Sequence, residues 1–159
     1  MTSPILGIEA SGLGQAMRQW LWLYPAVETV HITGIALLFG SIAVLDLRLL
    51  GFSSKISIRT LTKHVLPWTA ASFLLIVPSG LAMFTAHASE FIGNPVFALK
   101  MCLILGAGVN AALFHAGVFR GAAGWDVNVA PPPAARAAAA VSLLAWVSVI
   151  ACGRLLAYF

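Results

Sequence analysis

Ionisable side chains that can bind a cofactor stand inside the long apolar runs of this 159-residue chain. Glu28 and His31 are three residues apart, a spacing that places both side chains on one face of a helix. Three further histidines, His64, His87 and His115, fall in or beside other apolar runs. Neutral imidazole is the commonest metal ligand in proteins and the usual axial ligand of haem b. The histidines therefore indicate a haem or metal site, and the alternative for each is a plain hydrogen bond to a hydroxyl or carbonyl of a neighbouring helix.

A haem b site in a redox-linked, electron-transferring membrane subunit is the leading hypothesis. His31 and His115 are its expected axial ligands, with His64 as the substitute. The rise per residue places His31 nearer the outer side and His64 and His115 near the cytoplasmic edge, so the His31–His115 pair requires a shift in helix register. Lys100 stands in an apolar run and can hold an anionic group such as a haem propionate or a quinone-like ligand, or extend to the lipid headgroups. Asn110 can form a hydrogen bond between helices. We expect one site rather than two stacked haems, because the histidines are spaced too widely for two haems in a core of ~30 Å.

A metal-ion site for copper or another divalent metal is the second hypothesis. Glu28, His31 and His87 are its expected ligands, and Glu90 can join them as a second acid–histidine pair. A third hypothesis is a structural or assembly subunit that holds no cofactor. The sequence contains no serine, cysteine or paired-carboxylate arrangement for hydrolysis and no glycine-rich phosphate loop. An enzymatic role, if any, is therefore expected to be limited to electron transfer.

The composition places these residues in a membrane protein. Hydrophobic residues make up 60% of the chain and charged residues only 9%, whereas soluble domains carry about 25% charged residues. The net charge of +4 does not indicate nucleic-acid binding, because the basic residues lie at the ends of apolar runs instead of forming a patch. Cys102 and Cys152 lie within apolar runs and predict neither a disulfide nor a metal site. The lipid bilayer is therefore the first expected partner.

The apolar runs predict an all-α fold. We expect residues 1–159 to form one transmembrane domain, a four-helix bundle preceded by a short helix lying in the membrane interface. A helix rises 1.5 Å per residue, so roughly 20 apolar residues cross the hydrocarbon core. The expected spans cover about residues 22–47, 65–86, 96–118 and 137–156. Pro78 predicts a kink in the second span.

The distribution of lysine and arginine predicts the orientation, because short cytoplasmic loops carry an excess of both residues. The loops after the first and third spans hold Arg48, Lys55, Arg59, Lys63, Arg120 and Arg136, and the opposite side holds Arg18, Lys100 and Arg154. We therefore expect both termini in the periplasm of a bacterium and the protein in its inner membrane.

Three packing expectations follow from this topology. Asp46 is expected to pair with Arg48 or Arg120 at the cytoplasmic edge, and Glu28 with Lys100 in the outer half of the membrane. In the third span, small residues at 106–108 and 112 predict a close helix contact. This contact favours a homo-oligomer or a subunit of a membrane complex.

The runs ETVHITGIALLFGSIAVLDLRLLG, LPWTAASFLLIVPSGLAMF and NPVFALKMCLILGAGVNAALFH resemble a family of small four-span bacterial inner-membrane proteins with no assigned activity. The matching positions are Glu28, His31, Asp46, Arg48, Lys100, Asn110 and His115. The architecture is also distantly similar to copper-resistance D proteins and to four-helix b-type cytochromes. That second likeness rests on span number and helix-borne histidines, and it implies a haem or a metal only by analogy.

Overall fold

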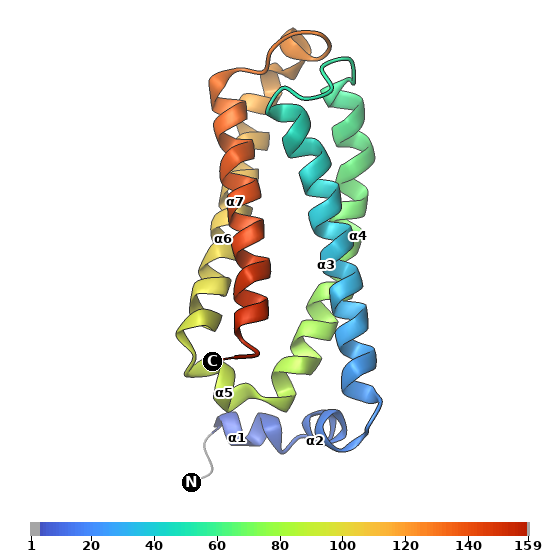
Figure 1. The fold of residues 1–159 in the computed structure, drawn as a ribbon, viewed down its shortest axis with the longest axis vertical. Coiled ribbons are helices and arrows are strands. Elements are labelled where there is room, and N and C mark those ends of the chain that lie inside the picture. Colours follow the sequence, from blue (N-terminus) through green and yellow to red (C-terminus); the bar gives the residue numbers. More distant parts are fainter. Residues whose placement is uncertain (1–3, 159) are drawn as a thin grey trace.

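Four long helices dominate the computed structural model, which describes residues 4–158 (Figure 1). They are α3 (Leu23–Leu49), α4 (Ile58–Ala86), α6 (Pro95–Ala116) and α7 (Pro133–Leu155). Each is long and apolar enough to cross a membrane. The described part of the chain contains no strand. The expected all-α bundle is confirmed, and the protein is a multi-pass membrane protein in contact with lipid.

The bundle is built from two antiparallel hairpins. Helix α3 packs along α4, and α6 packs along α7. The two hairpins meet through α3 and α7 (Figure 1). Helices α4 and α6 have no close backbone contact, and their rings Phe84 and Phe97 stack at a centroid distance of 5.9 Å at the end opposite Arg48. Pro67 and Pro78 lie within α4, and the second half of this helix slants toward the C-terminal hairpin. On the side between α4 and α6, the described chain therefore has no close backbone packing.

The observed helices differ from the expected spans mainly at α4. This helix begins at Ile58, whereas the sequence predicts a span from about Val65. The longer helix has a capped N-terminus, because the Ser57 hydroxyl accepts a hydrogen bond from the Thr60 N–H at 3.1 Å. Asp126 accepts a second hydrogen bond from the Arg59 N–H at 3.0 Å. Hydropathy alone misses this polar first turn, since caps involve residues outside the apolar run.

Two short helices, not the single expected one, precede the first span. They are α1 (Pro4–Glu9) and α2 (Gly12–Gln19), and Ser11 caps the second by accepting a hydrogen bond from the Gly14 N–H at 3.2 Å. Both lie across the end of the bundle, α1 beside α5 (Ala88–Ile92) and α2 against α4 (Figure 1). Met17 is buried there.

Hydrogen bonds tie this N-terminal segment to the bundle. The Glu9 carboxylate accepts from the Ser89 hydroxyl at 2.6 Å and from its N–H at 2.7 Å, and these bonds lower the pKa of Glu9. The Arg18 guanidinium donates to the Ala86 carbonyl at 3.0 Å. Hydrogen bonds therefore fix the N-terminal segment to the end of α4 and to α5.

Arg48 organises the opposite end of the bundle. It is only 2% exposed, and its guanidinium donates to the carbonyls of Ile56 (2.7 Å), Ser54 (3.1 Å) and Asp126 (2.8 Å). These carbonyls belong to the α3–α4 connection and to the residue that follows the 3-10 helix Val118–Trp125. The expected ion pair of Asp46 with Arg48 or Arg120 is absent from residues 4–158. Arg48 instead joins the loops at this end of the bundle through hydrogen bonds to their carbonyls, and it does not pair with Asp46.

Candidate functional site

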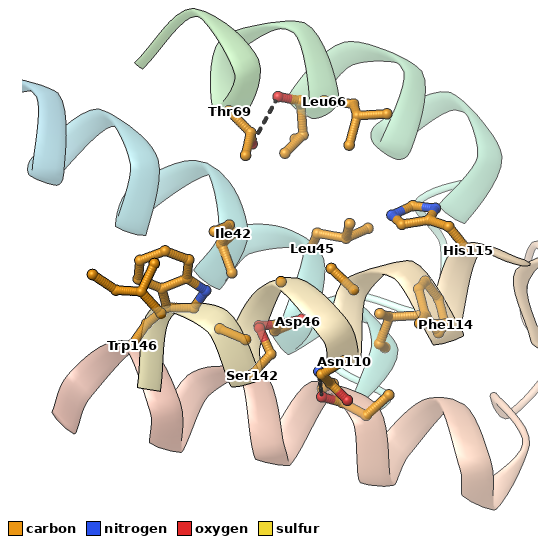
Figure 2. A pocket seen from close by; sticks show the side chains of 18 of the residues that line it. Ile42, Leu45, Asp46, Leu66, Thr69, Asn110, Phe114, His115, Ser142 and Trp146 are labelled. Carbon is orange, nitrogen blue, oxygen red and sulfur yellow. Dashed lines mark hydrogen bonds between the residues drawn. The ribbon is translucent and has the colours of Figure 1, made fainter. Parts of the chain in front are cut away.

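A cavity of about 220 Å³ lies among the four long helices, toward the end that carries Arg48 (Figure 2). Its walls are mostly aliphatic and aromatic, and all four spans contribute to them. The polar and aromatic side chains that line it are Asp46 from α3, Thr69 and Phe73 from α4, Asn110, Phe114 and His115 from α6, and Ser142 and Trp146 from α7. An apolar pocket with a few converging polar groups is the usual form of a small-molecule site.

Asp46 is the acidic group of this cavity. Only 5% of the residue is exposed, although it lies within a membrane-spanning helix. Ser142 on the facing helix α7 is within hydrogen-bonding reach of the carboxyl group, and Figure 2 shows the two side chains close together. The Oδ2 atom is buried and has no hydrogen-bond partner. Arg48 Nη1 and Thr62 Oγ1 are likewise buried without a partner, but among these three residues only Asp46 lines the cavity. Burial of a polar atom without a partner costs free energy, so Asp46 marks a place where a ligand would be stabilising.

The other polar groups of the cavity supply both acceptors and donors, because Ser142 carries a hydroxyl and Trp146 an indole N–H. The Thr69 hydroxyl donates its proton to the Val65 carbonyl at 3.2 Å, so its oxygen retains only acceptor capacity. The Asn110 side-chain N–H donates to the Ala138 carbonyl at 2.9 Å, which confirms the expected bond between helices. Figure 2 shows Asn110 and Asp46 on the same side of the cavity. The amide oxygen of Asn110 makes no hydrogen bond to the described chain.

His115 lies at one end of the cavity and Trp146 at the other (Figure 2). The imidazole contacts the rings of Phe114 and Phe119 edge-on, with both centroid distances at 5.2 Å. Within residues 4–158 its nitrogens form no hydrogen bond. His115 is thus a half-buried wall residue of the cavity, and His64, which is exposed near the start of α4, does not line it.

His31 lies toward the other end of the bundle, in the α3–α4 interface. Its Nδ1 lies 3.1 Å from the Ile76 carbonyl and 2.9 Å from the Ser79 hydroxyl. A Cβ atom added to Gly80 would lie 3.1 Å from the imidazole Cε1, so the ring rests closely on α4. These contacts match the alternative of a hydrogen-bonded histidine, and they leave Nε2 without a partner in the described chain. The structure does not bring His31 together with His115.

Lys100 and Glu28 do not form the expected ion pair in the described chain. Glu28 is exposed on α3, whereas Lys100 is half-buried. The Lys100 Nζ lies 3.7 Å from the position of a Cβ atom built on Gly153, so its side chain extends across α7. Glycine at 153 gives the lysine room to remain inside the bundle.

The expected metal ligands do not converge. His87 lies at the corner between α4 and α5, where its Nδ1 is 3.4 Å from a Glu90 carboxylate oxygen. Its ring contacts Tyr24 edge-on at a centroid distance of 5.9 Å. In the described ranges, no group of three or more His, Cys, Asp or Glu side chains is arranged to hold a metal ion. Glu28, His31 and His87 therefore do not form a three-ligand site.

The sequence analysis missed the cavity, although one signal pointed to it. Asp46 and Arg48 are two residues apart, and residues at that spacing do not share a helix face. An ion pair between them was therefore a poor expectation, and an unpaired Asp46 the better one. The contributions of Thr69, Ser142 and Trp146 depend on how the four helices are rotated, which spacing within one span does not reveal.

The comparison with known proteins gives a family without a function. Residues 7–159 match DUF6644, a family of unknown function. The chain belongs to this family. No curated protein and no solved structure matches the chain significantly. The match covers all four long helices and the cavity. Because the family has no known function, the interpretation of the site rests on its geometry.

Proposed function

We propose that this protein binds a small membrane-dissolved molecule in the cavity around Asp46. The observation that carries the proposal is the buried Oδ2 atom, which faces an apolar cavity and has no partner in the described chain. Native proteins satisfy nearly all their buried polar atoms, so each exception calls for an explanation, such as a functional role or a bound group. A ligand with an apolar body and one polar head would fill the volume and satisfy this oxygen.

The arrangement of the helices supports access from the bilayer. Helices α4 and α6 have no close backbone contact, and their Phe84–Phe97 ring contact lies at the end of the bundle opposite the cavity, so the cavity can open to lipid between these two helices. A molecule dissolved in the hydrocarbon can then reach Asp46 without crossing water. This favours a lipophilic ligand over an ion that would enter from an aqueous loop.

The membrane and orientation belong to the same proposal. We place the protein in a bacterial inner membrane with both termini in the periplasm, because the loops at the Arg48 end carry most of the basic residues. The Asp46 cavity then lies in the cytoplasmic half of the bilayer. Thiol labelling of the single variants Ser53→Cys and Ser89→Cys, both at exposed positions, tests this orientation. We expect the thiol of Ser53→Cys to react only after the membrane has been permeabilised.

Quenching of Trp146 fluorescence tests binding, using 4-bromophenol as a lipophilic probe with one hydrogen-bond donor. For the protein in lipid nanodiscs, we expect a saturable quenching component that disappears in Trp146→Phe. Ala139→Leu fills a wall position that is 1% exposed and should weaken this component. Gly40→Ala, at a site with open space around it, is the matched control. Quenching that rises linearly and is equal in all variants would show simple partitioning and refute the proposal.

Haem b binding is a second candidate, and one observation at His31 favours it. Its Nδ1 is engaged by the Ile76 carbonyl and the Ser79 hydroxyl, and this arrangement orients Nε2 for a metal. His31 would hold the iron, and half-buried Lys100 would neutralise a propionate. When bound, haem supplies one-electron transfer. The residues thus fit one axial position, and no second histidine lies at the same depth in residues 4–158.

An absorption spectrum of the dithionite-reduced protein tests the haem candidate. We expect a Soret band that is lost in His31→Ala and retained in His115→Ala. The absence of this band in protein produced with ample haem would remove the candidate. Elemental analysis of the same sample tests for stoichiometric copper, zinc or iron bound without haem.

A role as a homo-oligomer or as a subunit of a membrane complex is supported by α6. Outside the neighbouring backbone of α6 itself, no atom of the described chain lies within 4 Å of a Cβ position built on Gly106, so a second helix can approach there. Light scattering in detergent tests self-association, and Gly106→Leu should then give a smaller particle.

A further inference from the structure

We infer that the ligand of the Asp46 cavity is a hydrophobic monocation, an ammonium group with apolar substituents, which is exchanged for a proton at the Asp46 carboxyl. This inference rests on the proposed function and specifies its ligand class. It draws on the charge of the lining, its hydrogen-bond acceptors, and the aromatic walls.

The charges around the cavity favour a cationic ligand. Asp46 is the acid that α3 contributes, His115 is the titratable group that α6 contributes, and the wall residues of α4 and α7 contain no ionisable side chain. No lysine or arginine of the described chain lies within ion-pair distance of Asp46. Arg48 is close in sequence, but its guanidinium is bonded to loop carbonyls. The described chain therefore supplies no cation for an Asp46 carboxylate, and a ligand that ionises this group would have to carry the positive charge itself.

The walls also offer hydrogen-bond acceptors to a cationic ligand. Donors are present as well, since Ser142, Trp146 and His115 carry O–H or N–H groups and Asn110 keeps a second amide N–H. The acceptors are the Asp46 carboxyl and the oxygens of Thr69 and Asn110, which each donate one proton to a backbone carbonyl. An ammonium group is complementary, because it offers positive charge and donors or polarised C–H groups.

The aromatic walls suit the apolar substituents of such a cation. Phe73, Phe114 and Trp146 come from three different helices and line the same cavity. The faces of aromatic rings attract cations, and this attraction strengthens when water is excluded. A carboxylate surrounded by aromatic rings is thus suited to a cation too hydrophobic to remain in water.

The exchange is balanced in protons and charge. In the empty cavity the Asp46 carboxyl keeps its proton, since a lone carboxylate inside the membrane is costly. On binding, the O–H bond breaks, one proton leaves to water, and the carboxylate faces one monocation. The net charge of the site is unchanged, and no oxidant, reductant or other reactant is needed.

Calorimetry with benzyltrimethylammonium tests the inference, because this cation has a fixed charge at every pH. For the protein in nanodiscs we expect saturable binding that weakens at least tenfold in Asp46→Asn and is retained in Asp46→Glu. The matched control is Glu28→Gln, which removes an exposed acid on the same helix. Neopentylbenzene, the neutral carbon isostere, should compete poorly with the cation.

The pH dependence gives a second readout. Affinity should rise up to tenfold per pH unit in the acidic range, and titrations in buffers of different ionisation enthalpy should show release of about one proton. His115→Gln should leave this dependence in place, and Asp46→Asn should abolish it. Equal binding of the cation to wild type and Asp46→Asn would overturn the inference. If the neutral isostere binds and the cation does not, the cavity is a lipophile site and only the ligand class is wrong. If neither ligand binds, the proposed function fails as well.

Discussion

Replacing Gly34 by alanine should separate α3 from α4. A Cβ atom at this position would lie 2.8 Å from the Ile76 Cγ1, 3.0 Å from the Leu75 Cβ and 3.3 Å from the Ile76 backbone nitrogen. Carbon atoms in contact prefer 3.5–4.0 Å, so relief requires a shift of about 1 Å. Two of the three atoms are backbone or Cβ atoms, which rotamer changes do not move. The helices themselves therefore have to move apart.

The expected cost follows from this geometry. Overpacking of a tight contact typically costs about 1–3 kcal/mol, and part of this is offset because alanine favours the helix over glycine by up to about 1 kcal/mol. Gly40→Ala is the matched control on the same helix, since its added Cβ would meet nothing within 4 Å. We expect Gly34→Ala to be less stable than Gly40→Ala by about 1–3 kcal/mol.

Reversible unfolding in mixed detergent measures this difference, with helicity followed by circular dichroism. Gly40→Ala should unfold at or above the wild-type midpoint, and Gly34→Ala clearly below it. Equal midpoints for the two variants would refute the close α3–α4 contact and, with it, the depth at which His31 and Asp46 are placed.

Three further perturbations test the ends of the bundle. Arg48→Met should lower the free energy of unfolding by about 3–5 kcal/mol in thermal melts, because it leaves three carbonyls without their buried cationic donor. A decrease below about 1 kcal/mol would contradict the role of Arg48 in joining the loops. Gly14→Ala should detach the N-terminal helices, because its Cβ would lie 2.7 Å from the carbonyl oxygens of Glu9 and Thr85. Limited proteolysis should then cleave the N-terminal segment of this variant and leave the control Gly12→Ala intact. The hydrogen bond from the Arg59 N–H, with further hydrogen bonds, lowers the pKa of Asp126 in the folded protein. The ionised Asp126 carboxylate therefore stabilises the folded state above the pKa of an unfolded aspartate, about 3.9. This stabilisation is lost as the pH falls through the lower pKa of the folded state. Unfolding midpoints measured between pH 7 and pH 3 should therefore fall less steeply in Asp126→Asn, and parallel curves would contradict this role.

The membrane-spanning architecture could be predicted because it depends on one physical quantity. A run of apolar residues about 30 Å long has few stable alternatives in a bilayer, where every backbone group must bond within its own helix. The four spans follow from that requirement. The polar first turn of α4 could not be predicted in this way, since Ser57 and Asp126 cap it from outside the apolar run.

The candidate site was harder to predict than the spans. Residue type marks His31 and His115 equally as ligands, whereas the rise per residue places them at different depths, and the structure keeps them apart. The expected ion pair of Asp46 with Arg48 or Arg120 is not formed in the described chain, because the structure turns Asp46 and Arg48 to different surroundings. Which side chains share a cavity depends on the rotation and depth of each helix. Nearest-neighbour spacing in one chain does not contain that information.

The most direct measurement of the central claim is an anomalous difference map of the protein crystallised from lipid with 4-bromophenol. Binding at the Asp46 cavity predicts a bromine peak enclosed by α3, α4, α6 and α7, between Asp46 and Trp146. The same crystals of Ala139→Leu should show this peak weakened or lost. A map with bromine only on the lipid-facing surface of the helices, or a cavity closed by side chains, would contradict the claim.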